Sequence, residues 1–408
     1  MQTFPSRACI TQPGALLFFI PRAAHRIALA GFLASTWGLI LVPQSTAATV
    51  NILSGTTLEF NVPAGPDRVE PTTTFTGGGT LLKTGAGQLR WGQNQAATFA
   101  LGTGSLIDIQ GGTIKGGDFG DENWINNFSD LNVAAGSKFD GVEAKVRVDV
   151  LTGSGRVSSG YQPSYGASLT FGVDGGSGDF SGTLANYVDP ANVSYAGNFF
   201  KAGTGTQTLS GIVGNSYTGT MTVNGGTLAL AKSAGNAVSG SSVTLNTGGT
   251  LLLQSPNQIA DAAAMTLSGG TFSTGTGANE TLGTLTLSSN SAISLGASIH
   301  NLTFGASNLA AWSPAATLTI NGWSGTAGLT GSQGRIFFGS NASSLTDAQL
   351  AKITFQNFSP GAQLLGTGEL VPTAVPETEV YVAGLLIAGL VVWRERRRLA
   401  SLVPVVQD

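Results

Sequence analysis

Cysteine and histidine are almost missing from this chain of 408 residues. The one cysteine is Cys9, and the two histidines are His25 and His300. A disulfide needs two cysteines, so none forms within the chain. A zinc site built from several histidines is excluded as well. We therefore expect no metal and no cofactor, and we interpret His300, beside Asn301, as a strand or turn residue rather than a catalyst.

Charge is also scarce. Charged residues make up 10% of the chain, compared with about 25% in an average globular protein. The acidic residues are scattered, and lysine and arginine form no basic face in the body of the chain. Nucleic acid is therefore not expected as a partner.

The first residues have the pattern of an export signal. Arg22, His25 and Arg26 precede an apolar stretch at 27–42, and small or polar residues follow at 43–48. A charged start, an apolar centre and small residues at the cleavage point are typical of a secretory signal peptide. We predict a signal peptide at 1–48, cleaved after Ala47 or Ala48, and therefore an exported protein.

The last residues, 373–408, have three parts in a fixed order. They are a short motif, an apolar run at 380–393 and a basic cluster, with the motif at Val375, Pro376 and Glu377 and the cluster at Arg394, Arg396, Arg397 and Arg398. A crossing of the hydrocarbon core needs about 20 apolar residues, so the run predicts a short membrane helix. The arginines are expected to stay in the cytoplasm. An ordinary single-pass anchor is the alternative.

This tail resembles the PEP-CTERM sorting signal, although Thr378 stands where that signal usually has a second proline. The resemblance implies a transient stay in the inner membrane and cleavage near Pro376 by an exosortase-type membrane protease, after transport by the secretion machinery. It also implies a Gram-negative bacterium that makes exopolysaccharide. The mature protein is then expected at the cell surface or in the extracellular matrix, either released or re-anchored.

The body of the chain repeats a short unit in which Gly-Gly-Thr is followed by alternating apolar residues. The second glycine of the unit is Gly226, then Gly249, then Gly270. Alternation of apolar residues predicts strands, so the class is all-β. Because the same residue recurs at the same corner, stacking as a right-handed parallel β-helix is favoured over a sandwich. We expect positive φ at these corners, so that valine at Gly226 or Gly249 would be destabilising.

A longer motif around the Gly226 repeat carries a family resemblance. Lys201-Ala-Gly-Thr-Gly leads through Leu209-Ser-Gly and Asn215-Ser-Tyr to the repeat at 223–228, and a weaker copy opens with Lys83-Thr-Gly-Ala-Gly. The pattern resembles the autotransporter-associated β-strand repeat. The resemblance implies a β-helical passenger on an exported protein. We place this β-solenoid at 49–312.

From Leu318 onward the repeat texture fades. Thr346 and Gln349 have the spacing of a capping box, which predicts a helix start. Because a solenoid needs a terminal cap, we interpret 313–372 as the C-terminal cap.

Two functions remain open. The first is a structural or adhesive protein of the cell surface or matrix, without a catalytic site. The second is a polysaccharide-binding or polysaccharide-degrading β-helix that uses an insertion at 118–147, the most charged part of the body. Its candidate ligand loop contains Asp118, Asp121, Glu122 and Trp124, with the tryptophan as a platform for a sugar ring. A solvated loop followed by a strand at 142–148 is the structural alternative for this stretch.

Overall fold

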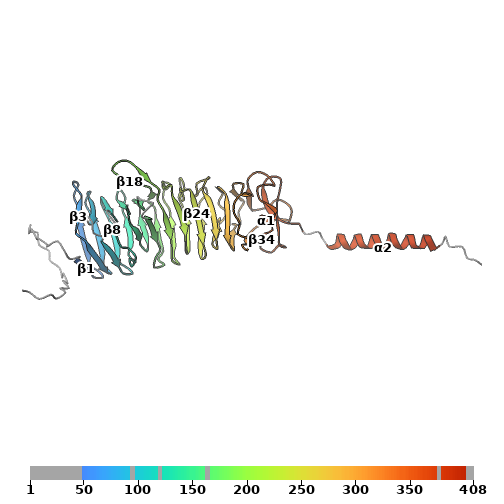
Figure 1. Ribbon diagram of the computed structural model, residues 1–408, viewed down its shortest axis with the longest axis horizontal. Helices are drawn as coiled ribbons and strands as arrows, with labels where there is room; N and C mark the ends of the chain where they lie inside the picture. Colours follow the sequence, from blue (N-terminus) through green and yellow to red (C-terminus); the bar gives the residue numbers. More distant parts are fainter. Residues whose placement is uncertain (1–47, 92–96, 118–121, 161–165, 375–377, 401–408) are drawn as a thin grey trace, which may run out of the picture. The chain divides into compact units, whose positions relative to one another are not determined.

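The computed structural model describes residues 48–91, 97–117, 122–160, 166–374 and 378–400. Its core is a stack of coils whose short strands lie on three faces, and several turns in the middle of the chain contribute strands to only two of these faces. The longest face is a sheet of 13 strands, and Figure 1 shows its strands side by side in chain order. These strands are β2 (Thr57–Asn61), β5 (Thr80–Thr84), β8 (Leu106–Ile109), β10 (Asp130–Val133), β13 (Leu151–Gly153), β16 (Gly178–Phe180), β21 (Thr206–Leu209), β23 (Gly226–Leu230), β25 (Gly249–Leu253), β27 (Thr271–Ser273), β30 (Ser291–Ser294), β32 (Leu318–Asn321) and β34 (Ile353–Phe355).

The second face consists of a three-stranded and a seven-stranded sheet. The first contains β1 (Ala48–Ile52), β4 (Thr73–Gly77) and β7 (Thr98–Leu101). The second contains β12 (Lys145–Arg147), β15 (Ser168–Phe171), β20 (Phe199–Lys201), β22 (Thr220–Val223), β24 (Ser242–Asn246), β26 (Ala264–Ser268) and β29 (Leu285–Ser289).

The third face consists of a six-stranded and a five-stranded sheet. The first contains β3 (Arg68–Glu70), β6 (Gln88–Trp91), β9 (Thr113–Lys115), β11 (Lys138–Asp140), β14 (Arg156–Ser158) and β17 (Thr183–Ala185). The second contains β28 (Glu280–Leu282), β31 (His300–Phe304), β33 (Gly334–Phe338), β35 (Ala362–Leu364) and β36 (Glu369–Pro372).

Parallel, in-register pairing joins successive coils. Gly226 pairs with Gly249, and Leu228 pairs with Leu251 on the next coil. The alternation of apolar residues along each strand therefore produces a ladder of inward side chains, one per coil. One such ladder is Leu228, Leu251, Phe272, Ile293, Ile320 and Phe355, all of them buried. Full burial of each apolar side chain is worth about 1.5–3 kcal/mol. The all-β parallel solenoid predicted from the repeats is confirmed.

Positive φ was predicted at Gly226 and Gly249, and it is found at only the first of these two glycines. Gly226 has φ of +59°, as expected. At the next coil the positive φ, +82°, belongs to Gly248 and not to Gly249. Gly249 is required for another reason, because a Cβ there would lie 2.5 Å from the carbonyl oxygen of Val223. Each Gly-Gly pair thus contains a residue with positive φ and a residue whose backbone lies close to the preceding coil. The position of the positive φ within the pair differs between the two corners.

The C-terminal part of the solenoid continues the same sheet before it ends. β32 and β34 lie within 313–372 and add to the long parallel sheet. β36 then pairs antiparallel with both β33 and β35. The predicted helix start is confirmed as α1 (Asp347–Leu350), where Thr346 caps the helix and forms a capping box with Gln349.

The last described element is helix α2 (Thr378–Ala400), which contains the apolar run and the arginine cluster. Arg397 lies over the ring of Trp393, 4.2 Å from its centroid. Among the helices in the described part of the chain, none combines the length and the apolar character needed for a membrane crossing. The helix expected at 380–393 is therefore present within α2.

Candidate functional site

The loop predicted to bind a ligand does not form the predicted platform. Asp118 and Asp121 lie outside the described residues, and Glu122 is buried. Trp124 is 1% exposed, and its ring stacks on Phe99 with 3.9 Å between centroids. Its indole nitrogen donates to the carbonyl oxygen of Gly116 at 3.0 Å. The prediction that Trp124 holds a sugar ring is wrong, because apolar packing places this side chain in the core.

The charged residues that follow belong to regular coils rather than to an insertion. Asp130 begins β10, and the stretches 138–140 and 145–147 are the strands β11 and β12. Burial raises the pKa of the Asp130 carboxyl, one oxygen of which accepts from the backbone N–H of Val150 at 3.1 Å. The structural alternative, a strand within 142–148, therefore describes this part of the chain better.

A different segment leaves the coils. After β17 the chain forms an antiparallel hairpin of β18 (Tyr187–Val188) and β19 (Ser194–Tyr195) before it enters β20. Figure 1 shows the segment labelled β18 looping out beyond the ends of the stacked strands. We refer to residues 187–195 as the display hairpin.

Local chemistry closes the tip of the display hairpin. Asp189 and Pro190 favour a tight turn at this point, and Asn192 takes φ of +61°, which asparagine tolerates better than most residues. The carboxylate of Asp189 accepts from the backbone N–H of Val193 at 2.8 Å and from the hydroxyl of Tyr195 at 3.2 Å. The turn is thus held by its own side chains.

The display hairpin presents one apolar pair to solvent. Val188 and Val193 are each 47% exposed, whereas Tyr187 is 5% exposed. The rings of Tyr187 and Tyr195 lie 6.4 Å apart between centroids. The tyrosines therefore form the base of the display hairpin, and the valines are its exposed large apolar residues, beside the exposed residues 190–192 and Ser194.

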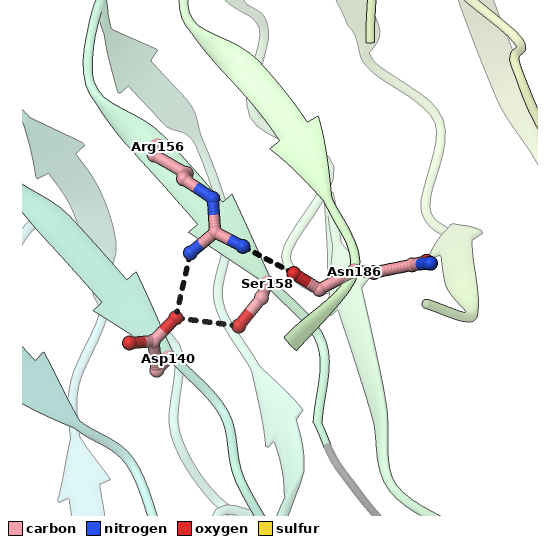
Figure 2. Close-up of polar contacts among 4 residues, drawn as sticks. All are labelled: Asp140, Arg156, Ser158 and Asn186. Carbon is pink, nitrogen blue, oxygen red and sulfur yellow. Dashed lines mark hydrogen bonds and ion pairs between the residues drawn. The ribbon is translucent and has the colours of Figure 1, made fainter. Parts of the chain in front are cut away.

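A polar cluster ties the base of the display hairpin to two coils. Figure 2 shows Asp140 of β11 between Arg156 and Ser158 of β14, with the guanidinium of Arg156 extending to the main chain of Asn186. Asp140 accepts from the Ser158 hydroxyl at 2.7 Å and from Arg156 at 3.4 Å. Arg156 also donates to the carbonyl oxygen of Asn186. One guanidinium thus links the third face of the solenoid to the residue that precedes the display hairpin.

The side chain of Asn186 then closes the base from within. Its amide oxygen accepts from the backbone N–H of Gly197 at 3.1 Å and of Thr218 at 2.9 Å. Its amide nitrogen donates to the hydroxyls of Ser194 and Thr218, each at 3.1 Å. The second end of the display hairpin is therefore bound to the side chain of the residue that precedes its first end, and this side chain is in turn bound to the next coil.

His300 has the structural role expected for it. It begins β31, is 2% exposed, and its ring nitrogens lie 2.9 Å from the Thr274 hydroxyl and 2.8 Å from the Ser298 carbonyl oxygen. Within the described ranges, no three residues of the types His, Cys, Asp and Glu are grouped closely enough to hold a metal ion.

The sorting residues are only partly described. Ala47 and the motif at Val375, Pro376 and Glu377 lie outside the described residues, whereas Ala48 begins β1. The arginines of the basic cluster are exposed on α2. The structure therefore leaves both cleavage predictions as predictions.

The display hairpin was missed from the sequence, although a signal for it was present. Asp189-Pro190-Ala191-Asn192 is a strong turn sequence between two short segments with tyrosine and valine. Charge density drew attention to 118–147 instead.

Comparison with known proteins gives one family match. The family model described as passenger-associated-transport-repeat matches residues 199–230 of the chain. No curated protein matches, and no solved structure matches. The matched stretch begins with β20, shortly after the display hairpin, and extends to the end of β23. Together, the repeat and the parallel solenoid are consistent with an exported, surface-type β-helix protein of the autotransporter-passenger kind.

Proposed function

We propose that the mature protein is a structural or adhesive β-solenoid of the bacterial cell surface or matrix, and that it acts by holding the display hairpin out for contact. One observation carries this proposal. The display hairpin exposes an apolar pair, Val188 and Val193, while its base is bound through Asn186 and Arg156 to neighbouring coils. Loops held on a rigid scaffold are where binding functions concentrate.

The apolar pair gives a direct test of adhesion. We would compare the parent with Val188→Ser plus Val193→Ser in an exporting bacterium, by cell-to-cell settling at matched surface amounts. The matched control is Ile212→Ser plus Val213→Ser, since these residues are also exposed but lie at an ordinary corner. We expect slower settling for the hairpin variant alone. Equal settling of parent and hairpin variant, or equal loss in both variants, would contradict the proposal.

We further propose that the tail at 373–408 is a PEP-CTERM-type sorting signal, read at the inner membrane by an exosortase-type protease. The order of the motif, the apolar run and the basic cluster supports it. Proline restricts the preceding residue to extended backbone, which suits a protease substrate. Pro376→Ala with Glu377→Ala should leave an uncut precursor in the inner membrane. Thr378→Ala with Glu379→Ala should be processed as the parent is.

Fractionation followed by blotting against the body of the protein measures both outcomes. If the variant at Pro376 and Glu377 is cut and exported like the parent, the sorting interpretation fails and the tail is only an anchor.

Polysaccharide binding or degradation through 118–147 is not favoured. Trp124, its proposed platform, is packed in the core, and Asp140 is engaged with Arg156 and Ser158. Exopolysaccharide stays as a candidate contact of the display hairpin rather than of this stretch.

A further inference from the structure

Two buried lysines occupy equivalent positions on different faces of the solenoid. Lys83 lies near the end of β5 and Lys201 ends β20, and each opens a Lys-x-Gly-x-Gly sequence. Both side chains are fully buried, with 0% exposure. A buried lysine destabilises the folded chain unless its ammonium group has hydrogen-bond partners.

The ammonium group of Lys83 lies in a cage of backbone carbonyl oxygens. It donates to Thr84 at 2.9 Å and Gly85 at 2.8 Å, which are in its own corner. It also donates to Gly111 of the next coil at 2.9 Å. The three N–H donors of one ammonium group are thus divided between two coils.

Lys201 repeats this arrangement at another corner. Its ammonium group donates to Ala202 at 2.5 Å and Gly203 at 3.3 Å in its own corner, and to Gly225 of the next coil at 3.3 Å. In both copies the forward partner is the first glycine of a Gly-Gly pair, Gly111 before Gly112 and Gly225 before Gly226. Burial lowers the pKa of Lys201 to about 8, with Asp149 opposing the shift, so the group is still mostly protonated at pH 7.

The glycines allow the two corners to approach each other. A Cβ at Gly111 would lie 2.9 Å from the Gly85 carbonyl oxygen, and a Cβ at Gly225 would lie 3.0 Å from that of Gly203. The first distance is shorter than real Cβ contacts, and the second is tighter than nearly all of them. The Gly-Gly pair of one coil therefore rests directly on the Gly-x-Gly of the coil before it.

The lysine stems pack in the core in the same way in both copies. In register, Lys83 lies between Phe60 and Ile109. Lys201 lies between Phe171 and Val223. In both copies, the residue paired with the lysine on the preceding coil is a phenylalanine, and the residue paired with it on the next coil is aliphatic. These apolar neighbours shield the ammonium group from water.

We propose that the lysine of Lys-x-Gly-x-Gly is an ammonium latch that fastens its coil to the Gly-Gly corner of the next coil. The matched repeat at 199–230 spans both halves of one latch, the lysine at 201 and the glycines at 225–226. A third buried lysine, Lys232, donates backward to the carbonyl oxygen of Gly182 at 2.5 Å. Lys201 therefore fastens two coils that follow the display hairpin, and Lys232 connects the chain after the hairpin to the coil before it.

If the Lys201 ammonium group fastens this corner, its removal should loosen the corner locally, whereas a loss of general packing would not be confined to it. Two backbone amides close the same corner, Asn224 N–H to the Lys201 carbonyl at 2.7 Å and Thr227 N–H to the Gly205 carbonyl at 3.1 Å. In the full-length protein, Lys201→Met keeps the apolar stem but removes the ammonium group. Hydrogen exchange at these two amides should become roughly 10- to 100-fold faster, the range expected for loss of hydrogen bonds to a charged group. Lys138→Met is the control, because Lys138 is exposed on β11.

A second variant tests the chemistry of the cage. Lys201→Ala removes the atoms that propylammonium can replace, so added propylammonium should restore slow exchange at both amides. Tetramethylammonium at the same ionic strength has no N–H donor and should not. If the alanine variant fails to fold, recovery of folding with propylammonium alone supports the latch in the same way.

Two results would overturn the proposal. One is exchange in Lys201→Met within about twofold of that in the parent and in Lys138→Met, given that each lost charged hydrogen bond predicts a larger change. The other is an equal effect, or no effect, of propylammonium and tetramethylammonium on Lys201→Ala.

Discussion

Glycine is required at the Gly-Gly corners for two reasons, positive φ and close contact with the preceding coil, and three corner glycines allow the two to be measured separately. Gly248 has φ of +82° with nothing within 4 Å of an added Cβ. Gly249 has ordinary φ, but its added Cβ would lie 2.5 Å from the Val223 carbonyl oxygen. Gly226 combines both conditions, with φ of +59° and the Gly203 carbonyl oxygen 2.6 Å from an added Cβ. Alanine at each position therefore measures strain alone, contact alone, and the two together.

The expected magnitudes follow from these geometries. Left-handed backbone costs a non-glycine residue about 1–2 kcal/mol, which is the whole expected effect of Gly248→Ala. Overpacking against backbone costs about 1–3 kcal/mol, which we expect for Gly249→Ala. Gly226→Ala should then be the most destabilising, at about 2–5 kcal/mol, if the two terms add.

Urea unfolding of the three variants beside the parent is the assay, with hydrogen exchange at the affected corner as a local check. Stacked coils do not have to unfold in one step, so the local check shows whether the loss is confined to the corner. If Gly248→Ala is as destabilising as Gly226→Ala, the contact with the preceding coil contributes nothing, contrary to our expectation. Three variants as stable as the parent would show that neither the positive φ nor the close contact requires glycine.

Three further predictions follow. Burial raises the pKa of Glu280 from 4.5 to about 7, so between these pH values the folded chain holds a proton that the unfolded chain releases. The free energy of unfolding should therefore fall by up to about 3 kcal/mol as the pH rises from 4.5 to about 7. Urea titrations at several pH values should show this slope in the parent but not in Glu280→Gln. Trp124→Ala should lower the free energy of unfolding by about 3–5 kcal/mol in the same assay. Ile125→Ala, at a residue 69% exposed, should change it by less than about 0.5 kcal/mol. Equal effects of the two variants would contradict the burial of Trp124. Asn186→Ala should make 187–195 the first site of limited proteolysis, at least about tenfold faster than in the parent, because four hydrogen bonds at the base are lost.

The repeats made the fold readable from the sequence because stacking has one strict requirement. Residues that recur at equal spacing, such as Leu228 and Leu251, must lie over each other in a solenoid. The capping box at Thr346 was equally readable, since it depends on two residues three positions apart. Which glycine of a pair takes positive φ was not readable, because the same two residues, Gly-Gly, stand at both corners.

The candidate site was harder to predict because burial depends on partners far away in the sequence. Trp124 looked like a surface aromatic among charges, but Phe99 of the preceding coil stacks on it. The display hairpin depends on Asn186, whose partner Thr218 lies one coil further along. Attention therefore went to a charge-rich segment whose described residues from Asp130 onward belong to regular coils, while the short and nearly neutral display hairpin does leave the coils.

The central claim is that the display hairpin faces the outside of the cell. Because Cys9 is the only cysteine and falls in the predicted signal peptide, Val193→Cys gives the mature protein a single thiol. We expect a membrane-impermeant maleimide to label this thiol on intact cells, whereas the buried control Val223→Cys should be labelled only after denaturation. Labelling of Val193→Cys only after the cells are lysed would contradict it.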